Sequence, residues 1–505
     1  MTDTTAAAVP DDTTGRGRSS DGIVLAIACV AQFMVVLDVS IVNVALPSIG
    51  RDLHYSPTGL QWVVNAYVLT FAGFLLLGGR AADIFGRRRI YLLGMFLFTA
   101  ASLVGGVAQN SAWLTAARAM QGIGGAILSP ATLTIIVTTF SGARVAKALG
   151  TWSAVAGAGG ATGAVLGGVL TAELSWRWVL FVNIPIGALA MAAAVRYLTE
   201  LRTKDAAQAR SLDVAGAVTV TAGLGVLIYA IVGTDTHAWT STYTLALLGV
   251  AAALLAVFTF IELRVATRPL VPFRLFRSRS VTGANAVMLL VGAAFFSMWY
   301  FLSLYMQNVL HYSALRAGLA FLPMGLVIIV GAQTSSRILP RSGVRPLLLG
   351  GTALAAVGFV WLTRIDAHSG YPLHVLLPGC LISLALGVLF TPLASAATAG
   401  VHFTEAGLAS GVLNTSRQMG GSLGLAALAT VATDRTHAVL AAGHGALSAA
   451  VALTDGYARA FAGAVILAAV ALACSFVVPS IRARHDRGAH APVDQAALAL
   501  DAEPA

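Results

Sequence analysis

The chain of 505 residues is 57% hydrophobic and only 10% charged, and its formal net charge is +10. A soluble globular protein carries about 25% charged residues, so a water-soluble fold is excluded for this chain. Apolar runs of about 18 to 25 residues recur along it, each long enough to cross the bilayer as a helix, whereas a β-barrel shows alternating segments of about ten residues. The sequence therefore predicts an all-α membrane protein.

Fourteen predicted spans follow one another along the chain, each ending where polar or charged residues interrupt an apolar run. They are expected at residues 22–46, 57–79, 90–108, 112–136, 146–171, 177–197, 212–233, 242–262, 281–307, 315–338, 345–363, 372–398, 406–432 and 459–480. Residues 1–21 and 481–505 are poor in apolar runs and are expected to be disordered tails. The first 21 residues also lack the basic start and apolar core of a signal peptide.

Lysine and arginine residues are distributed unequally between the two sides of this arrangement. Of the 31 in the chain, 23 fall on the side of the two chain ends and six on the opposite side. Because cytoplasmic loops carry an excess of Lys and Arg, both ends are predicted to be cytoplasmic, in a bacterial plasma membrane. The positive charge then faces anionic lipids of the inner leaflet, and no nucleic-acid partner is needed to explain it.

No sequence pattern indicates a metal, a redox centre or a nucleotide. The three cysteines, Cys29, Cys380 and Cys474, lie singly in apolar runs, and the histidines show no zinc-binding spacing. A phosphate-binding loop is also missing from the sequence, which argues against ATP as the direct energy source. We therefore expect a protein that has no cofactor and is not an enzyme.

A weak internal repeat divides the series of spans. Gly79–Arg89 and Arg337–Arg345 both place basic residues around a glycine in a short loop. If the two loops correspond, the chain divides into 22–197 for a first six-helix half, 198–211 for a cytoplasmic linker, 212–262 for two inserted helices, 263–280 for a basic cytoplasmic loop and 281–480 for a second six-helix half. Two such halves around a midplane cavity are an architecture of secondary transporters.

Several motifs along the chain resemble those of one transport family. They are Leu37–Pro47 in the first span, Gln61–Thr70 in the second, Gly79–Arg88 in the loop that follows, Arg118–Gly124 in the fourth span, Trp176–Gly187 at the sixth and Gly411–Gly424 in the thirteenth. In this order they resemble the major facilitator superfamily, specifically its fourteen-span drug/proton antiporters. The resemblance implies two halves that open alternately to either side and are driven by the proton gradient.

The fifth span departs from the family pattern at one position. The antiporter motif of the family reads Gly-Pro-x-x-Gly-Gly, whereas Gly163-Ala164 precedes Gly167 and Gly168 here. Gly159, Gly163 and Gly167 lie at i, i+4 and i+8, so they form one helix face that a neighbouring helix can approach closely. Ordinary tight packing explains this face as well as a role in transport does. Export as the direction of transport therefore rests on the wider resemblance.

Asp38 is the one acidic residue predicted to lie deep within a span. A charge at the centre of a span costs about 2.5–3.5 kcal/mol on insertion scales, so it needs a partner or a wet cavity. At about 1.5 Å per residue from the span ends, Asp38 and Arg118 lie at similar depth. A dry site favours the neutral carboxyl and a nearby Arg the charged one. We expect Asp38 and Arg118 to bind the coupling proton or a cationic substrate; a fixed structural pair is the alternative.

Further residues are assigned to the transport path. The candidates for the substrate cavity are Asn43, Trp62, Tyr67, Gln121, Tyr305, Gln307, Asn414 and Arg417. Membrane-interface anchoring, core packing or hydrogen bonding between helices are the alternatives for such residues. The resemblance implies a cytoplasmic gate formed by Gly79, Asp83, Gly86, Arg87 and Arg88. Asp83 would accept hydrogen bonds from a neighbouring helix end, whereas the arginines also fit a solvated basic cluster.

These features favour proton-coupled export of amphipathic or cationic drugs or antibiotics by alternating access. The expected partners are small hydrophobic or cationic substrates, protons and membrane lipid. Transport of one specific metabolite or siderophore is the alternative. Drug resistance on expression, with efflux that an uncoupler abolishes, would distinguish drug export from it. A membrane-embedded enzyme or sensor is a third class, but the sequence has no nucleophile motif, zinc signature or sizeable soluble domain.

Overall fold

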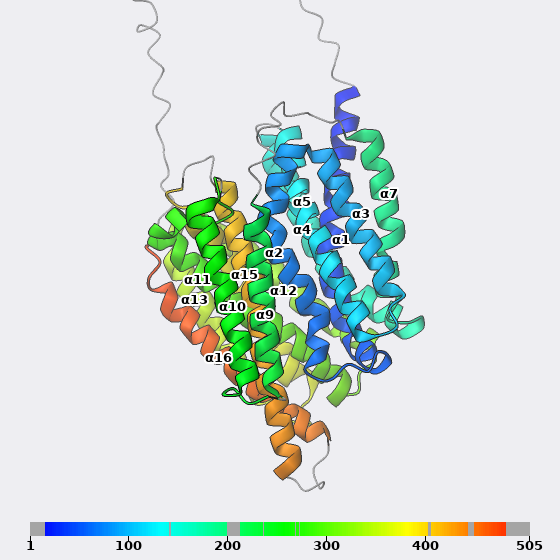
Figure 1. Cartoon of the computed structure of the whole chain (residues 1–505), viewed down its shortest axis with the longest axis vertical. Coiled ribbons are helices and arrows are strands. Elements are labelled where there is room, and N and C mark those ends of the chain that lie inside the picture. The colour runs from blue at the N-terminus through cyan, green and yellow to red at the C-terminus, as the bar shows by residue number, and fades with distance from the viewer. Residues whose placement is uncertain are drawn as a thin grey trace, which may run out of the picture.

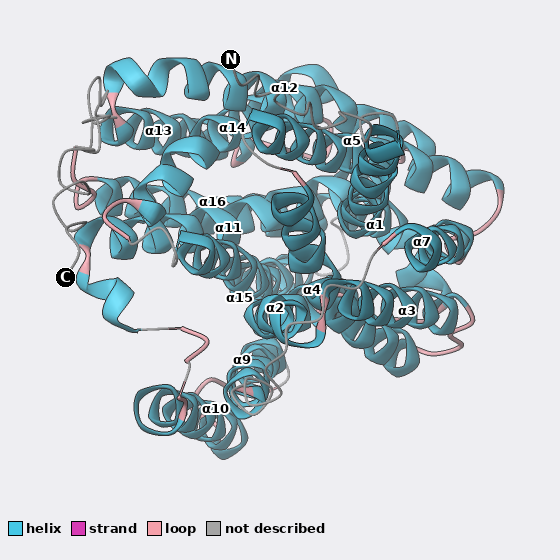
Figure 2. Cartoon of the chain, turned by 90° about the horizontal axis from the view of Figure 1, so that it is seen from above, coloured by secondary structure: helices cyan, strands magenta, loops and turns pink. Residues whose placement is uncertain are grey.

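The computed structural model describes residues 16–140, 143–198, 213–235, 237–267, 269–271, 273–401, 406–442 and 449–480. The elements in these ranges are helices, joined by short loops and turns (Figure 2). Thirteen of the helices are long and apolar enough to cross a membrane. The predicted span at 406–432 corresponds to a fourteenth long helix, α15 (Ala406–Ala442), in which the polar run from Asn414 to Gln418 interrupts the apolar sequence. The predicted all-α membrane fold is confirmed.

The long helices form one elongated bundle (Figure 1). Those of the first half are α1 (Arg16–Asp52), α2 (Trp62–Phe85), α3 (Arg87–Gly106), α4 (Ser111–Thr139), α5 (Ala143–Glu173) and, after the short α6 (Trp178–Phe181), α7 (Asn183–Tyr197). Two further helices follow, α9 (Val214–Val232) and α10 (Thr242–Phe260). Those of the second half are α11 (Arg279–Leu304), α12 (Ala314–Ser342), α13 (Val344–Leu362), α14 (Leu377–Thr398), α15 and α16 (Ala449–Ser475).

Short 3₁₀ and π turns adjoin several of these helices. The 3₁₀ turns are Gly59–Gln61, Gly233–Asp235 and Phe273–Arg277, and the π turns are Ile261–Val265, Tyr305–Val309 and Pro372–Leu376. Side-chain oxygens cap the first turns of four helices: Asn110 accepts from the N–H of Trp113, Asp213 from Gly216, Ser241 from Thr244 and Ser313 from Arg316. These caps satisfy donors that a helix start leaves without an intrahelical partner.

The two halves pack internally in the same pattern. In the first half α1 lies against α5, and α4 lies against α2 and α3. In the second half α11 lies against α15, and α14 against α12 and α13. The α9–α10 pair packs as a hairpin, and α9 contacts both α2 and α15. This hairpin therefore straddles the boundary between the halves on one side, as Figure 2 shows.

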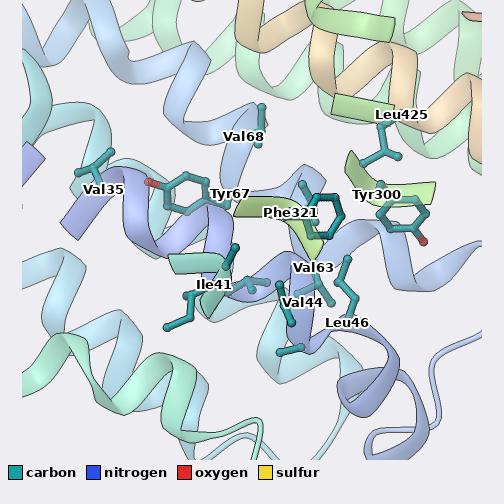
Figure 3. Close-up of a cluster of buried hydrophobic side chains, with 14 of the residues drawn as sticks. Val35, Ile41, Val44, Leu46, Val63, Tyr67, Val68, Tyr300, Phe321 and Leu425 are labelled. Atoms are coloured by element: carbon teal, nitrogen blue, oxygen red, sulfur yellow. The ribbon is translucent and has the colours of Figure 1, made fainter. Parts of the chain in front are cut away.

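The hydrophobic core continues from one half into the other. Figure 3 shows part of it, with Ile41 and Val44 of α1 and Tyr67 of α2 near Phe321 of α12. All four side chains are buried. Burial of such side chains stabilises their contacts by dispersion and close packing, because lipid supplies little hydrophobic driving force between helices.

Helices α5 and α12, one from each half, approach closely at one end of the bundle and less closely toward the other. A methyl group added at Gly168 of α5 would lie 2.6 Å from the Cα atom of Leu315 of α12, too close for any side chain. Further along the same two helices, a methyl at Gly325 would meet only the Ala161 Cβ atom, at 3.9 Å, and one at Gly157 nothing within 4 Å. We call the end that carries the α11–α12 connection the closed end, and the end that carries the α2–α3 connection the open end.

Helix α1 begins earlier than the sequence predicted. It starts at Arg16, so residues 16–21, expected as part of a disordered tail, are helical. Extending a helix that is already formed adds a hydrogen bond per residue and needs no new nucleus, which explains helical residues beyond the apolar run. Residues 1–15, 199–212 and 481–505, which include most of the predicted tails and linker, lie outside the described residues.

Candidate functional site: a buried ion pair and a deep arginine

Asp38 and Arg118 form an ion pair inside the first half. The Arg118 Nη1 atom lies 2.6 Å from Asp38 Oδ2, and the two side chains are 2% and 0% exposed. The same guanidinium donates from Nε to the Val63 carbonyl at 3.0 Å and from Nη1 to Gln121 Oε1 at 2.6 Å. Its centre lies 4.5 Å from the centroid of the Tyr67 ring, a cation–π arrangement. Helices α1, α2 and α4 are thus joined around one cation.

Two amide side chains complete the surroundings of the carboxylate. Gln121 Nε2 donates to Asp38 Oδ1 at 2.7 Å, and Asn183 Nδ2 of α7 donates to the same oxygen at 3.3 Å. Both amides also donate to the Ser102 hydroxyl of α3, each at 2.9 Å. Asp38 therefore receives donors from Arg118, Gln121 and Asn183, an arrangement suited to the charged carboxylate. Sequence reasoning did not assign Ser102 or Asn183 to the site.

Asn43, Trp62 and Tyr67, which are predicted to line the substrate cavity, make contacts within α1, with α9 and with Arg118. Asn43 donates from Nδ2 to the Val39 carbonyl within α1 at 2.7 Å. The Trp62 ring centroid lies 6.4 Å from that of Tyr229, so this indole is part of the contact between α2 and α9. Tyr67 is buried against Arg118.

Tyr305 and Gln307 lie at the closed end. The Tyr305 hydroxyl donates to the Asp366 carbonyl at 2.7 Å, and the side chain is fully buried. Gln307 Nε2 donates across the boundary to the Val44 carbonyl of α1 at 2.9 Å, and Ser303 Oγ donates to the Asn43 carbonyl at 2.8 Å. Gln307 and Ser303 therefore join the two halves at the closed end, whereas the Tyr305 bond lies within the second half.

Near the closed end a tyrosine ties the α1–α2 connection to α4. The Tyr55 hydroxyl donates to the Ser111 carbonyl at 2.7 Å and lies 2.9 Å from the Thr115 hydroxyl. Burial raises the pKa of Tyr55, so this hydroxyl stays protonated and remains a donor.

Asn414 and Arg417 lie on a face of α15 that becomes more buried with distance from the open end. Ser410 is exposed, Asn414 and Arg417 are half-buried, and Gly421 is buried. These positions share one helix face, because they are three or four residues apart. The side chains on this face therefore become less exposed from Ser410 toward Gly421. Arg417 Nη2 donates to Asn414 Oδ1 at 2.9 Å, and the guanidinium lies 5.6 Å from the Phe390 ring centroid.

Small residues of α5 lie against two different helices, α1 and α12. A methyl added at Gly159, Gly163 or Gly167 would lie 2.7–2.9 Å from backbone oxygens of α1. Ala164 and Gly168 face α12 instead: a methyl at Gly318 would clash with the carbonyl of Ala164, the residue that stands where the family motif has proline. Close approach of α5 to α1 and of α5 to α12 therefore both depend on missing side chains.

The loop between α2 and α3 turns at Gly86, whose φ of 93° favours glycine. A methyl at Gly79 would lie 3.5 Å from the Pro130 Cβ atom of α4. Arg87 donates to the Thr138 hydroxyl, and Arg88 donates to the Val195 carbonyl at 2.7 Å. Asp83 belongs to the last turn of α2, but its side chain lies outside the described part of the structure.

Comparisons with known proteins agree with this architecture. Residues 28–425 match the Major Facilitator Superfamily. The chain is 45% identical to the cephamycin export protein CmcT of Amycolatopsis lactamdurans, over 89% of this chain and 90% of that protein. It is 41% identical to the puromycin resistance protein pur8 of Streptomyces alboniger, over 92% and 93%.

A solved structure shares the fold at low sequence identity. It is a bacterial homolog of the human lysosomal transporter Spinster in an inward-facing, occupied conformation, with a TM-score of 0.66, 15% identity and coverage of 92% of this chain and 97% of that one. The family match and the relatives confirm the resemblance found in the sequence. The chain belongs to the major facilitator superfamily and is a multi-pass membrane transporter rather than an enzyme.

Proposed function

We propose that this transporter exports amphipathic antibiotics or similar drugs in exchange for protons. The observation that carries the proposal is Asp38, a carboxylate without exposed surface that three side-chain donors surround. A buried ionisable group in a membrane protein is costly to insert and marks proton or substrate pathways. Protonation would remove the charge that Arg118 neutralises, so the free energy of this site depends on proton binding.

Helix α1 offers a route from the proton site to the contact between the halves. The carbonyls of Asn43 and Val44, which accept hydrogen bonds from α11 and from the π turn after it, lie five and six residues after Asp38. At about 1.5 Å per residue this separation is about 8–9 Å along the helix. The ion pair holds α1 against α4, and its loss on protonation would free α1 to shift at the closed end. Alternating access requires two packing arrangements of the helices, and here they would be α1 held against α4 and α1 released from it.

The open end is assigned to the cytoplasm on the basis of charge. Arg80 and Arg87–Arg89 lie around the α2–α3 connection, and Arg337, Arg341 and Arg345 around the α12–α13 connection. Cytoplasmic loops carry such an excess. The face of α15 that carries Asn414 and Arg417 would then lead inward from the cytoplasm of a bacterial plasma membrane, where a drug to be exported enters. The names of the two relatives, an export protein and a resistance protein, support this direction.

Efflux from a pump-deficient bacterial host tests the proposal. Expression should lower accumulation of exported antibiotics, and an uncoupler of the proton gradient should restore it. In inverted membrane vesicles, Asp38→Asn should abolish the dependence of drug uptake on the proton gradient. Asp52→Asn is the matched control, since Asp52 is 47% exposed and pairs with Arg177 at the surface. Unchanged proton coupling in the Asp38→Asn variant would refute the assigned role of Asp38.

A further inference from the structure

Arg417 is a cation deep in the second half that has no anionic partner among the described residues. Its side chain donates to Asn414 Oδ1, and its buried Nε atom has no hydrogen-bond partner within the described part of the chain. The sequences of α11 and α14, which pack beside α15, contain no acidic residue, and α15 has none before Asp434. A buried charge without a partner is expensive, so this position is a candidate for binding an anion.

The surroundings of Arg417 combine this charge with apolar surface. Phe390 of α14 presents its ring to the guanidinium, and both side chains are half-buried. Ser410 and Asn414 precede Arg417 on the face of α15 that leads in from the open end. The guanidinium therefore lies where this face passes from exposed Ser410 to buried Gly421.

The deep charges of the first half do not balance this cation. Asp38 and Arg118 neutralise one another within their own half, at 2.6 Å and without appreciable exposure. An anionic group that reaches Arg417 along this face of α15 meets one uncompensated positive charge, whereas a cationic group is repelled by it.

We propose that Arg417 binds an anionic group of the substrate, and that the substrates include amphipathic carboxylates. This inference rests on the proposed export function and narrows it to a substrate class. A carboxylate can accept two parallel N–H bonds from a guanidinium, and the apolar remainder of the molecule can lie against Phe390. Asn414 would hold the guanidinium in place through its bond to Nη2.

A pair of fluorescent probes that differ in charge alone tests this assignment. The probes are 7-diethylaminocoumarin-3-carboxylate and its 3-carboxamide, and binding to the full-length protein in nanodiscs is followed by fluorescence anisotropy at neutral pH. We expect the wild type to bind the carboxylate at least about tenfold more tightly, as a hydrogen bond to a charged group implies. No preference for the carboxylate, whether both probes bind or neither does, would overturn the proposal.

Variants of Arg417 test whether this residue causes the preference for the carboxylate probe. In Arg417→Met the ratio of the affinities for the two probes should approach one. Arg417→Lys keeps the charge and should therefore retain part of the preference for the carboxylate probe. Arg435→Met is the control: Arg435 lies in the same helix but pairs with Asp455 at the surface, so the ratio should not change. A ratio that survives in Arg417→Met would contradict the assignment. Thermal unfolding of each variant separates loss of binding from loss of fold.

Two further arms distinguish the source of the anion. Displacement of the carboxylate probe by inorganic phosphate at cellular concentration, or by phosphatidylglycerol in the nanodisc, would assign Arg417 to a phosphate group and overturn the proposal. Failure of the export function is measured separately, by antibiotic accumulation in cells. A protein that exports antibiotics but shows no carboxylate preference would keep the proposed function and lose only this inference.

Discussion

The carbonyl oxygen of Asn43 accepts a hydrogen bond from Ser303 Oγ at 2.8 Å, across the boundary between the two halves. Pro47 lies four residues after Asn43 within α1 and has no N–H, so this carbonyl lacks its usual intrahelical donor. The next carbonyl, of Val44, accepts from Gln307. A proline inside the membrane helix thus provides an acceptor through which the closed end is held together.

Removing these two donors should weaken the closed end. Each hydrogen bond contributes about 0.5–1.5 kcal/mol net, so Ser303→Ala combined with Gln307→Leu should shift the balance toward opening of this end by about 1–3 kcal/mol. Spin labels at the exposed positions 51 and 316, in a background without the three native cysteines, report the separation by pulsed electron resonance. A larger population of long distances is expected.

The matched control for this prediction lies in the same helix. Ser297 Oγ donates to the Ala293 carbonyl within α11, so Ser297→Ala removes a buried hydroxyl without touching α1. Its distance distribution should match the wild type. If the double variant also keeps the wild-type distribution, these bonds do not hold the closed end.

Arg118 should contribute strongly to the stability of the fold, because it neutralises the buried charge of Asp38. Breaking a buried pair by removal of one partner costs about 3–5 kcal/mol, since the other charge is left uncompensated. Arg118→Met should therefore lower the thermal unfolding midpoint in detergent, and addition of Asp38→Asn should restore much of the loss. Arg144→Met serves as the control, because Arg144 is 62% exposed and its pair with Asp21 is at the surface. A double variant no more stable than Arg118→Met would argue against uncompensated charge as the cause.

The pairing of Asp38 with Arg118 could be predicted from the sequence, and the rest of its surroundings could not. Depth along a straight helix follows from counting residues, so two charges at similar depth could be matched. The contacts of Ser102 and Asn183 depend on how α3 and α7 are rotated about their axes, which the hydrophobic pattern of a membrane helix does not fix. For Ser303 a signal was present in the sequence: Pro47 predicts a free carbonyl at Asn43, but not which helix supplies the donor.

Ala164 stands where the family motif has proline, and Ser40 should make a proline tolerable there. Proline at 164 would remove the N–H that a helix directs at the Gly160 carbonyl. Ser40 Oγ already donates to that carbonyl at 2.6 Å, so the oxygen would keep a partner. Ala164→Pro should therefore cost less than the about 3 kcal/mol typical of a helix interior. In the Ala164→Pro background, Ser40→Ala should lower the thermal unfolding midpoint by more than it does in the wild type. Equal decreases in the two backgrounds would exclude this compensation.

Gly318 should be required for the closed arrangement of the halves. A side chain at this position would meet the carbonyl oxygen of Ala164 across the α5–α12 contact, and backbone cannot move aside as a flexible side chain can. Gly318→Val should therefore disfavour the closed end and reduce export, with a larger population of long distances between labels at positions 51 and 316. Gly325→Val is the control in the same helix, because a methyl there would meet only the Ala161 Cβ atom at 3.9 Å. Because both substitutions add the same apolar volume to α12, a difference between them reports the α5–α12 contact rather than helix propensity. Equal distance distributions in the two variants would contradict the role assigned to Gly318.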